Sequence, residues 1–220
     1  MKNEFIDLSV KLQKVLGKEG LFVIPFEEPG LPFFSSLTRE QKDVILEQMQ
    51  TLLEIAQDLQ AHNLKVTEPA NLIRTFFKKF NLHAPARVVD SITKHDIVDV
   101  WNLDSRLIIA SFNFFDICTY SLEELFCRPW AELFSRDNDI HIQIYQLCRS
   151  LLNGEITQPV DTTYIPQHKV RETYAPEKHY AVLQPRIFSP VYAGDKLFGF
   201  MSVNRIIKLE PEKVLRLLDE

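Results

Sequence analysis

Apolar residues recur at helical spacing through the first third of the chain. Residues 3–16 and 69–81 each place their apolar side chains on one side of a helix. Between them, Thr38 and Gln41 form a capping-box pair, in which each side chain satisfies a backbone donor at a helix start. No glycine or proline interrupts residues 39–62, so the pattern predicts a long helix there.

The longest of these helices carries an apolar stripe with the 4-3-4-3 spacing of a helix-pairing seam, formed by Ile45, Met49, Leu52, Ala56 and Leu59. Additional apolar residues at positions 46, 53 and 55 widen the stripe, which is typical of a helix buried in a core. We therefore expect residues 1–85 to form a helical region that serves dimerisation or docking, or that simply caps the rest of the chain.

The pattern changes to strands near residue 95. Residues 96–102 and 107–112 predict a hairpin. Short helices are expected over 113–119, 121–127 and 129–134, and Ser121 with Glu124 repeats the capping pair. A longer helix over 138–152 is predicted to end at Asn153 and Gly154, a dipeptide that suits a left-handed cap.

Three further strands are predicted, over residues 156–165, 179–192 and 197–207. The polar segment 166–178 between the first two is expected to be a lid or a disordered tip. Residues 210–220 predict a short C-terminal helix. Pro185 and Pro190 conflict with the second strand, because proline cannot donate to a β-ladder, so we expect bulges or a shorter strand.

Composition excludes some functions and favours others. With 220 residues, of which 45% are hydrophobic, the chain can bury one core and a smaller helical domain. The chain has a formal net charge of −5 and so lacks the excess of basic residues that binds phosphate backbones. Nucleic acid is therefore not an expected partner. Three widely spaced cysteines, Cys118, Cys127 and Cys148, indicate free thiols in a reducing compartment. The absence of an apolar leader or span predicts a cytoplasmic protein without membrane contact.

Motifs for catalysis are not apparent, and no enzyme activity is predicted. Asp96, Asp99 and Asp104 cluster in the sequence, but carboxylates on strands and turns are expected to be solvated. Five of the six histidines are scattered and do not pair with Cys or Asp at ligand spacing, so no metal site is predicted. They are His62, His83, His95, His168 and His179.

The order of two strands, a run of helices and three antiparallel strands resembles a PAS domain over residues 95–208. Asn113 stands where PAS domains often have an Asn opening the first helix, and Tyr120 begins a YSLEEL segment similar to the family's GYSxEEL. Gly154 and Gly194 match glycines at the end of the long helix and in the last turn. The resemblance implies an α+β fold, with a five-stranded antiparallel sheet and helices packed on one face, preceded by the N-terminal helical region.

The residues do not match those that bind the known PAS cofactors. Aligned on Tyr120, Trp130 falls where flavin-binding light sensors have their reactive cysteine, and Cys127 is out of register, so a covalent flavin is not expected. Haem-binding members supply an axial histidine from the helical side. His141 opens the helix 138–152, but one histidine near a helix start is more typical of the surface. The cofactor therefore stays unidentified.

The resemblance implies a small-molecule site between sheet and helices. The residues expected to line it are Phe115, Leu125, Trp130, Phe134, Tyr145, Phe198 and Phe200. We predict a cytoplasmic, bacterial-type sensory or regulatory protein that binds a small apolar or aromatic ligand and transmits the signal through a homodimer or a protein partner. A ligand-free adaptor for protein–protein interaction, or a transcription regulator acting through its N-terminal helices, is the alternative.

Overall fold

The computed structural model describes residues 1–174 and 179–209. The predicted helix 210–220 lies outside the described residues. Five helices precede the main strands: α1 (Lys2–Gly17), α2 (Pro32–Ser36), α3 (Arg39–Ala61), α4 (Pro69–Phe80) and α5 (Ala86–Asp90). The predicted capping box is confirmed, because Thr38 Oγ1 accepts from Gln41 N at 3.3 Å and Gln41 Oε1 accepts from Thr38 N at 3.0 Å.

One antiparallel sheet follows, in the order β3-β2-β8-β7-β6-β4. Its longer strands are β2 (Asp96–Asn102), β3 (Leu107–Ala110), β6 (His168–Glu172), β7 (Tyr180–Ala193) and β8 (Lys196–Leu209). The α+β class is confirmed. The prediction of five strands was wrong, because the sheet has eight strands among the described residues: β1 (Leu82–His83), β4 (Phe134–Ser135) and β5 (Val160–Asp161) add two residues each.

The connection between the hairpin and the later strands is helical, as predicted. It contains η1 (Phe112–Asp116), α6 (Leu122–Cys127), α7 (Trp130–Leu133) and α8 (Asn138–Leu152). Ser121 and Glu124 form the predicted capping box of α6. Gly154 follows α8 with a φ of +71°, a left-handed conformation that favours glycine.

The third main strand was predicted in the wrong place. Of residues 156–165, only Val160 and Asp161 pair, whereas residues 168–172 of the expected loop form β6 against β7. The side chains at 168, 170 and 172 line a cavity, and two of them are polar. Because the inward face of β6 is partly polar, its sequence lacks the alternation of apolar and polar residues from which strands are predicted.

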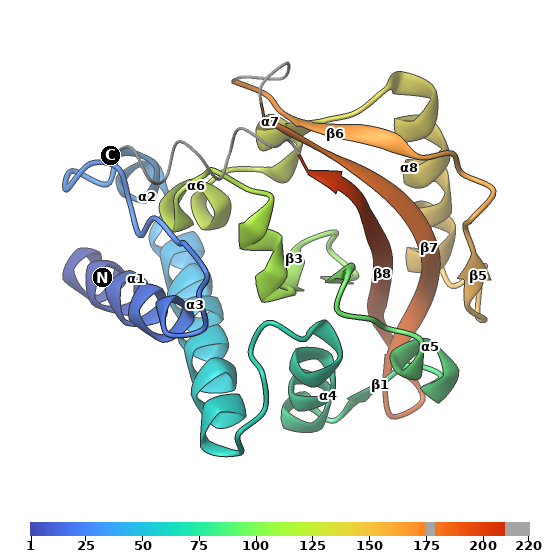
Figure 1. Ribbon diagram of the computed structural model, residues 1–220, viewed down its shortest axis with the longest axis horizontal. Coiled ribbons are helices and arrows are strands. Elements are labelled where there is room, and N and C mark those ends of the chain that lie inside the picture. The colour runs from blue at the N-terminus through green and yellow to red at the C-terminus, as the bar shows by residue number, and fades with distance from the viewer. Residues whose placement is uncertain (175–178, 210–220) are drawn as a thin grey trace.

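Helices cover both faces of the sheet, so the prediction of helices on one face was also wrong. Successive side chains of a strand point to opposite faces. Val98 and Val100 of β2 pack into the core with residues of α1, α3 and α4, whereas Trp101 packs with Leu147 and Leu151 of α8. In Figure 1, α8 lies on the side of β7 and β8 away from α1 and α3. One hydrophobic core therefore joins the N-terminal helices to the sheet.

The two prolines of β7 lie at breaks along one edge of that strand. β6 pairs with residues 180–183, β5 with residues 187 and 188, and β1 with residues 192 and 193. Pro185 and Pro190 fall in the intervals between these short partners. The missing donors of the prolines are accommodated because no neighbour on this edge pairs with either position.

A buried carboxylate joins β2 to β7 and β8. Asp96 is fully buried, and its Oδ2 accepts from Thr93 N at 2.7 Å and from Arg186 Nη1 at 2.6 Å. Its Oδ1 accepts from Arg205 Nε at 3.3 Å. Arg186 occupies the register shift between Pro185 and Ile187, so a bulge brings it to this position. The expectation that Asp96 is solvated was wrong, because paired cations compensate its burial.

None of the helices among the described residues combines the length and the apolar character needed to cross a membrane.

Candidate functional site

A cavity of about 60 Å³ lies between the sheet and the helical segment. It is bounded by β2, β6, β7 and β8 on the sheet side and by the residues around η1 and β4 on the other. Its walls combine apolar and ionisable side chains; they are Ile97, Asp99, Phe114, Ile117, Phe134, Arg136, His168, Val170, Glu172, Tyr180, Ala181, Leu183 and Asn204.

Asp99 faces this cavity from the middle of β2. Ser202 Oγ donates to Asp99 Oδ2 at 3.3 Å, and Asn204 Nδ2 donates to Ser202 Oγ at 3.1 Å. Asp99 Oδ1 is buried and has no hydrogen-bond partner within the described residues. Burial raises the pKa of Asp99 to about 6, although the Ser202 hydrogen bond and the charge of Arg136 oppose this rise. The expectation that Asp99 is solvated was therefore wrong.

Arg136 directly follows β4 in the chain and lines the cavity. Burial lowers its pKa, while the nearby negative charge of Asp99 acts in the opposite direction. In the part of the chain that the structure describes, the guanidinium makes no hydrogen bond or ion pair. A guanidinium carries five N–H donors, so this side chain offers an unused fork to an anionic or carbonyl oxygen.

His168 lies at the start of β6 and is only 6% exposed. Its Nδ1 is 3.1 Å from Pro166 O. Because a carbonyl oxygen can only accept, Nδ1 is the protonated nitrogen and Nε2 of the neutral ring presents a lone pair. Burial is the largest cause that lowers the His168 pKa, which favours this neutral form. Nε2 is buried without a partner among the described residues.

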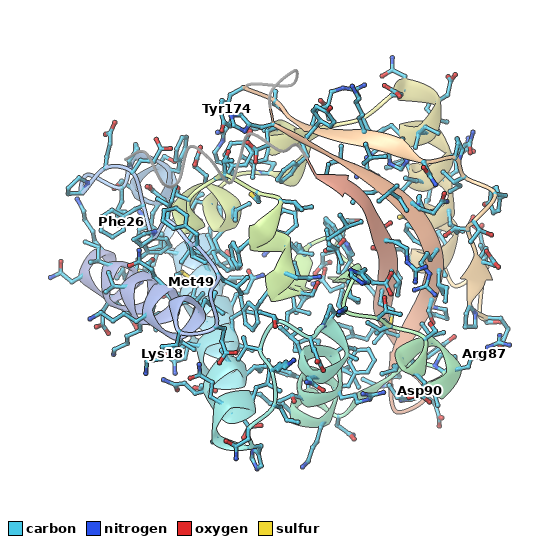
Figure 2. The ribbon with its side chains drawn as sticks, viewed as in Figure 1. Lys18, Phe26, Met49, Arg87, Asp90 and Tyr174 are labelled. Carbon is cyan, nitrogen blue, oxygen red and sulfur yellow. The ribbon has the colours of Figure 1, made fainter. Side chains whose placement is uncertain are left out.

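Glu172 lines the cavity, and its carboxylate is held by the segment before α6. This buried carboxylate accepts from Thr119 N at 2.6 Å and also from the Thr119 hydroxyl. Thr119 Oγ1 in turn contacts the hydroxyl of Tyr174, which Figure 2 labels beyond the end of β6. These bonds fasten the end of β6 to the segment before α6 and hold Glu172 in place in the cavity wall.

The predicted ligand-binding residues are largely elsewhere. Of the six whose side chains are described, only Phe134 lines the cavity. Leu125 is buried in the same cluster as Phe134, and Phe115 is half-buried beside it. Tyr145 is 62% exposed on α8. Nothing is described of the Trp130 side chain.

Phe198 and Phe200 lie in different parts of the core although they are two residues apart. The register of β8 passes from Val191↔Gly199 to Tyr192↔Leu197, so residue 198 is an extra residue in the strand. Phe198 packs against the core of the N-terminal helices, and Phe200 packs with α8. Both residues had been expected to line the site between sheet and helices.

The predicted dimerisation stripe is buried within the single chain. Its five residues, Ile45, Met49, Leu52, Ala56 and Leu59, are at most 7% exposed. Figure 2 shows Met49 among the side chains where α1 and α3 meet. This packing favours the core helix that the widened stripe indicated, and the stripe has no free face for a second copy.

The histidine and the cysteines considered for cofactors lie on or near the helical segment. His141 is exposed near the start of α8, as expected for a surface residue. None of the three cysteines forms a disulfide within the described residues, and burial raises the pKa of Cys148 to about 12. Within residues 1–174 and 179–209, no group of three or more His, Cys, Asp or Glu side chains could hold a metal ion.

Sequence reasoning missed the polar part of the cavity, namely Asp99, Arg136 and His168. One signal was present. Asp99 lies two residues from both Ile97 and Trp101 and therefore shares an apolar face of the strand with them, where a carboxylate needs a partner or a function. Arg136 and His168 lie outside any periodic segment and gave no comparable signal.

No known family model matches the chain, and no curated protein matches it.

Proposed function

We propose that this protein is a sensory protein with a PAS-like scaffold, which binds a small molecule in the cavity between its sheet and its helices. The observation that carries this proposal is a pair of buried polar atoms in the cavity wall, Asp99 Oδ1 and His168 Nε2, which have no hydrogen-bond partner among the described residues and share the cavity with the Arg136 guanidinium. Folded proteins rarely leave buried polar atoms unpaired, so a guest in the cavity is their natural partner.

The order of the elements supports this scaffold. β2 and β3 precede the helical segment from η1 to α8, and β6, β7 and β8 follow it as antiparallel strands. The resemblance to PAS domains implies this chain order and a ligand between sheet and helices. The cavity occupies that space.

Strand β2 offers a route by which binding reaches the N-terminal helices. Ile97 and Asp99 line the cavity, whereas Val98 and Val100 pack on the opposite face with α1, α3 and α4. A ligand that moves β2 therefore disturbs the packing of those helices. In the proposed mechanism, their altered position is sensed by a protein partner or by a second copy of the chain. The cysteines form no disulfide among the described residues, which suits a reducing compartment such as the cytoplasm.

The lining favours a polar ligand over the apolar or aromatic one that the sequence suggested. Phe114 and Phe134 supply apolar walls, but three ionisable side chains, Asp99, Arg136 and His168, share the same cavity. An apolar guest would leave these groups desolvated and unpaired, at a cost of about 1–3 kcal/mol each.

A ligand-free adaptor is the second candidate function. Ile142 and Tyr145 are 52% and 62% exposed on α8, and their spacing of three residues places them side by side on the helix. An exposed apolar pair of this kind is a contact that an adaptor would use.

Native mass spectrometry of the protein purified from its own host tests the proposal. Ala181→Leu fills the cavity with a larger side chain, and Ala193→Leu makes the same change on the same strand at an exposed position outside the cavity. We expect a small-molecule mass to be retained by the wild type and by Ala193→Leu, and to be lost from Ala181→Leu. A wild-type protein that retains no small molecule would favour the adaptor function. If Ala181→Leu retained the small molecule as well as the wild type, the binding site would lie outside this cavity.

A further inference from the structure

The unused groups of the cavity differ in hydrogen-bonding character. Asp99 Oδ1 and the lone pair of His168 Nε2 can only accept from a guest when the carboxyl is ionised and the ring is neutral. The Arg136 guanidinium can only donate. A guest that satisfies all three needs hydrogen-bond donors at one end and an acceptor at the other.

Charge points to the same kind of guest. Asp99 and Arg136 carry opposite charges in one cavity and influence each other, yet no ion pair joins them among the described residues. Asp96 pairs directly with Arg186 at 2.6 Å, so the fold elsewhere brings such groups together. A molecule with a positive and a negative end would bridge the separated charges of Asp99 and Arg136 and compensate their burial.

We propose that the ligand is a small zwitterionic amino acid, whose carboxylate binds Arg136 and whose ammonium donates to Asp99 Oδ1 and His168 Nε2. The inference rests on the proposed function and specifies the class of ligand. A carboxylate matches the guanidinium fork, and an ammonium has three donors for the two acceptors.

The size of the cavity limits the side chain of this ligand. A volume of about 60 Å³ holds roughly four to six water-sized groups. Glycine and L-alanine, with about five or six non-hydrogen atoms, fill that space, whereas larger amino acids need the walls to move. Phe114 and Phe134 can contact the methyl group of L-alanine.

Isothermal titration calorimetry with glycine and L-alanine tests the inference on the full chain. Propionate lacks the ammonium of L-alanine, and ethylamine lacks its carboxylate. We expect L-alanine to bind at least tenfold more tightly than either analogue. Arg136→Met and Asp99→Asn should each weaken L-alanine binding at least tenfold. The matched controls Arg149→Met and Asp139→Asn change exposed residues of α8 and should leave binding unchanged.

Two results would overturn the inference: a wild-type protein that binds neither glycine nor L-alanine, or variants at Arg136 and Asp99 that bind as tightly as the wild type. Circular dichroism melting of each variant establishes that it is folded. If neither amino acid binds but the protein from its host retains another mass that Ala181→Leu loses, the ligand class fails and the proposed function stands. If no mass is retained either, the cavity holds only water and both fail.

Discussion

The buried carboxylate of Asp96 and an exposed ion pair of equal length make a matched experiment. Arg186 Nη1 lies 2.6 Å from Asp96 Oδ2, with side-chain exposures of 19% and 0%. Lys79 Nζ lies 2.6 Å from Glu54 Oε2, with exposures of 38% and 42%. The distances are the same, but Asp96 is buried and also accepts from Arg205, whereas Glu54 is exposed. The substitutions Asp96→Asn and Glu54→Gln therefore compare a buried carboxylate with an exposed one, and each keeps the shape of its side chain.

The expected losses differ severalfold. Asp96→Asn replaces the charge-assisted bond from Arg186, worth about 1.5–3 kcal/mol, by a weaker neutral one. It also removes the acceptor for Arg205, whose 40% exposure limits this second loss to about 0.5–1 kcal/mol. The free energy of unfolding should therefore fall by about 2–4 kcal/mol. Glu54→Gln should lower it by less than about 1 kcal/mol, because water screens the exposed pair.

Urea unfolding followed by far-ultraviolet circular dichroism measures both quantities. The dependence on urea concentration should be the same in both variants and in the wild type, so that a shift in midpoint reports stability. Equal losses in the two variants, or a loss below about 1 kcal/mol for Asp96→Asn, would refute the argument that burial makes the Asp96 interactions strong.

Three further outcomes are expected. Gly199→Ala places a Cβ against the backbone oxygen of Trp101 and 2.8 Å from the Cα of residue 102. The variant should therefore lose its cooperative thermal transition or be insoluble. A normal melting curve would show that β2 and β8 can separate at this position. Ser121→Ala removes the acceptor for Glu124 N and should lower the unfolding free energy by about 1 kcal/mol, measured in urea, while an unchanged midpoint would mean that water replaces the cap. Burial raises the pKa of Asp99 to about 6 in the folded state from an ordinary value of 3.8, so its contribution to stability is fully present below the lower value and is lost as the pH rises through the higher one. The difference in urea midpoint between Asp99→Asn and the wild type should therefore grow in favour of the variant from pH 4 to pH 7; a constant difference would contradict the buried carboxylate.

Local signals predicted much of the fold. Thr38 with Gln41 and Ser121 with Glu124 mark helix starts through contacts within four residues, and the structure has both capping boxes. The hairpin of β7 and β8 was also predicted, because Gly194 supplies the positive φ of its turn. Such features depend on neighbours in the chain and need no knowledge of tertiary packing.

Tertiary relations account for the errors. β6 has no apolar alternation because His168 and Glu172 face the cavity, and β5 pairs only through Val160 and Asp161 although a longer strand was predicted there. The bulge at Phe198 turns this side chain to the opposite face of the sheet, and no local sequence pattern predicts the bulge. The candidate site combines side chains from several elements, so its chemistry became visible only once those elements were placed together.

The divided edge of β7 has a consequence for behaviour at high concentration. A strand of 14 residues with an open edge would be a template on which other molecules could add strands and aggregate. Three short partners cover this edge in turn, and Pro185 and Pro190 occupy the intervals between them. An incoming strand therefore finds no continuous row of free donors and acceptors. The prolines that interrupt the ladder thus protect the molecule against self-association through its longest strands.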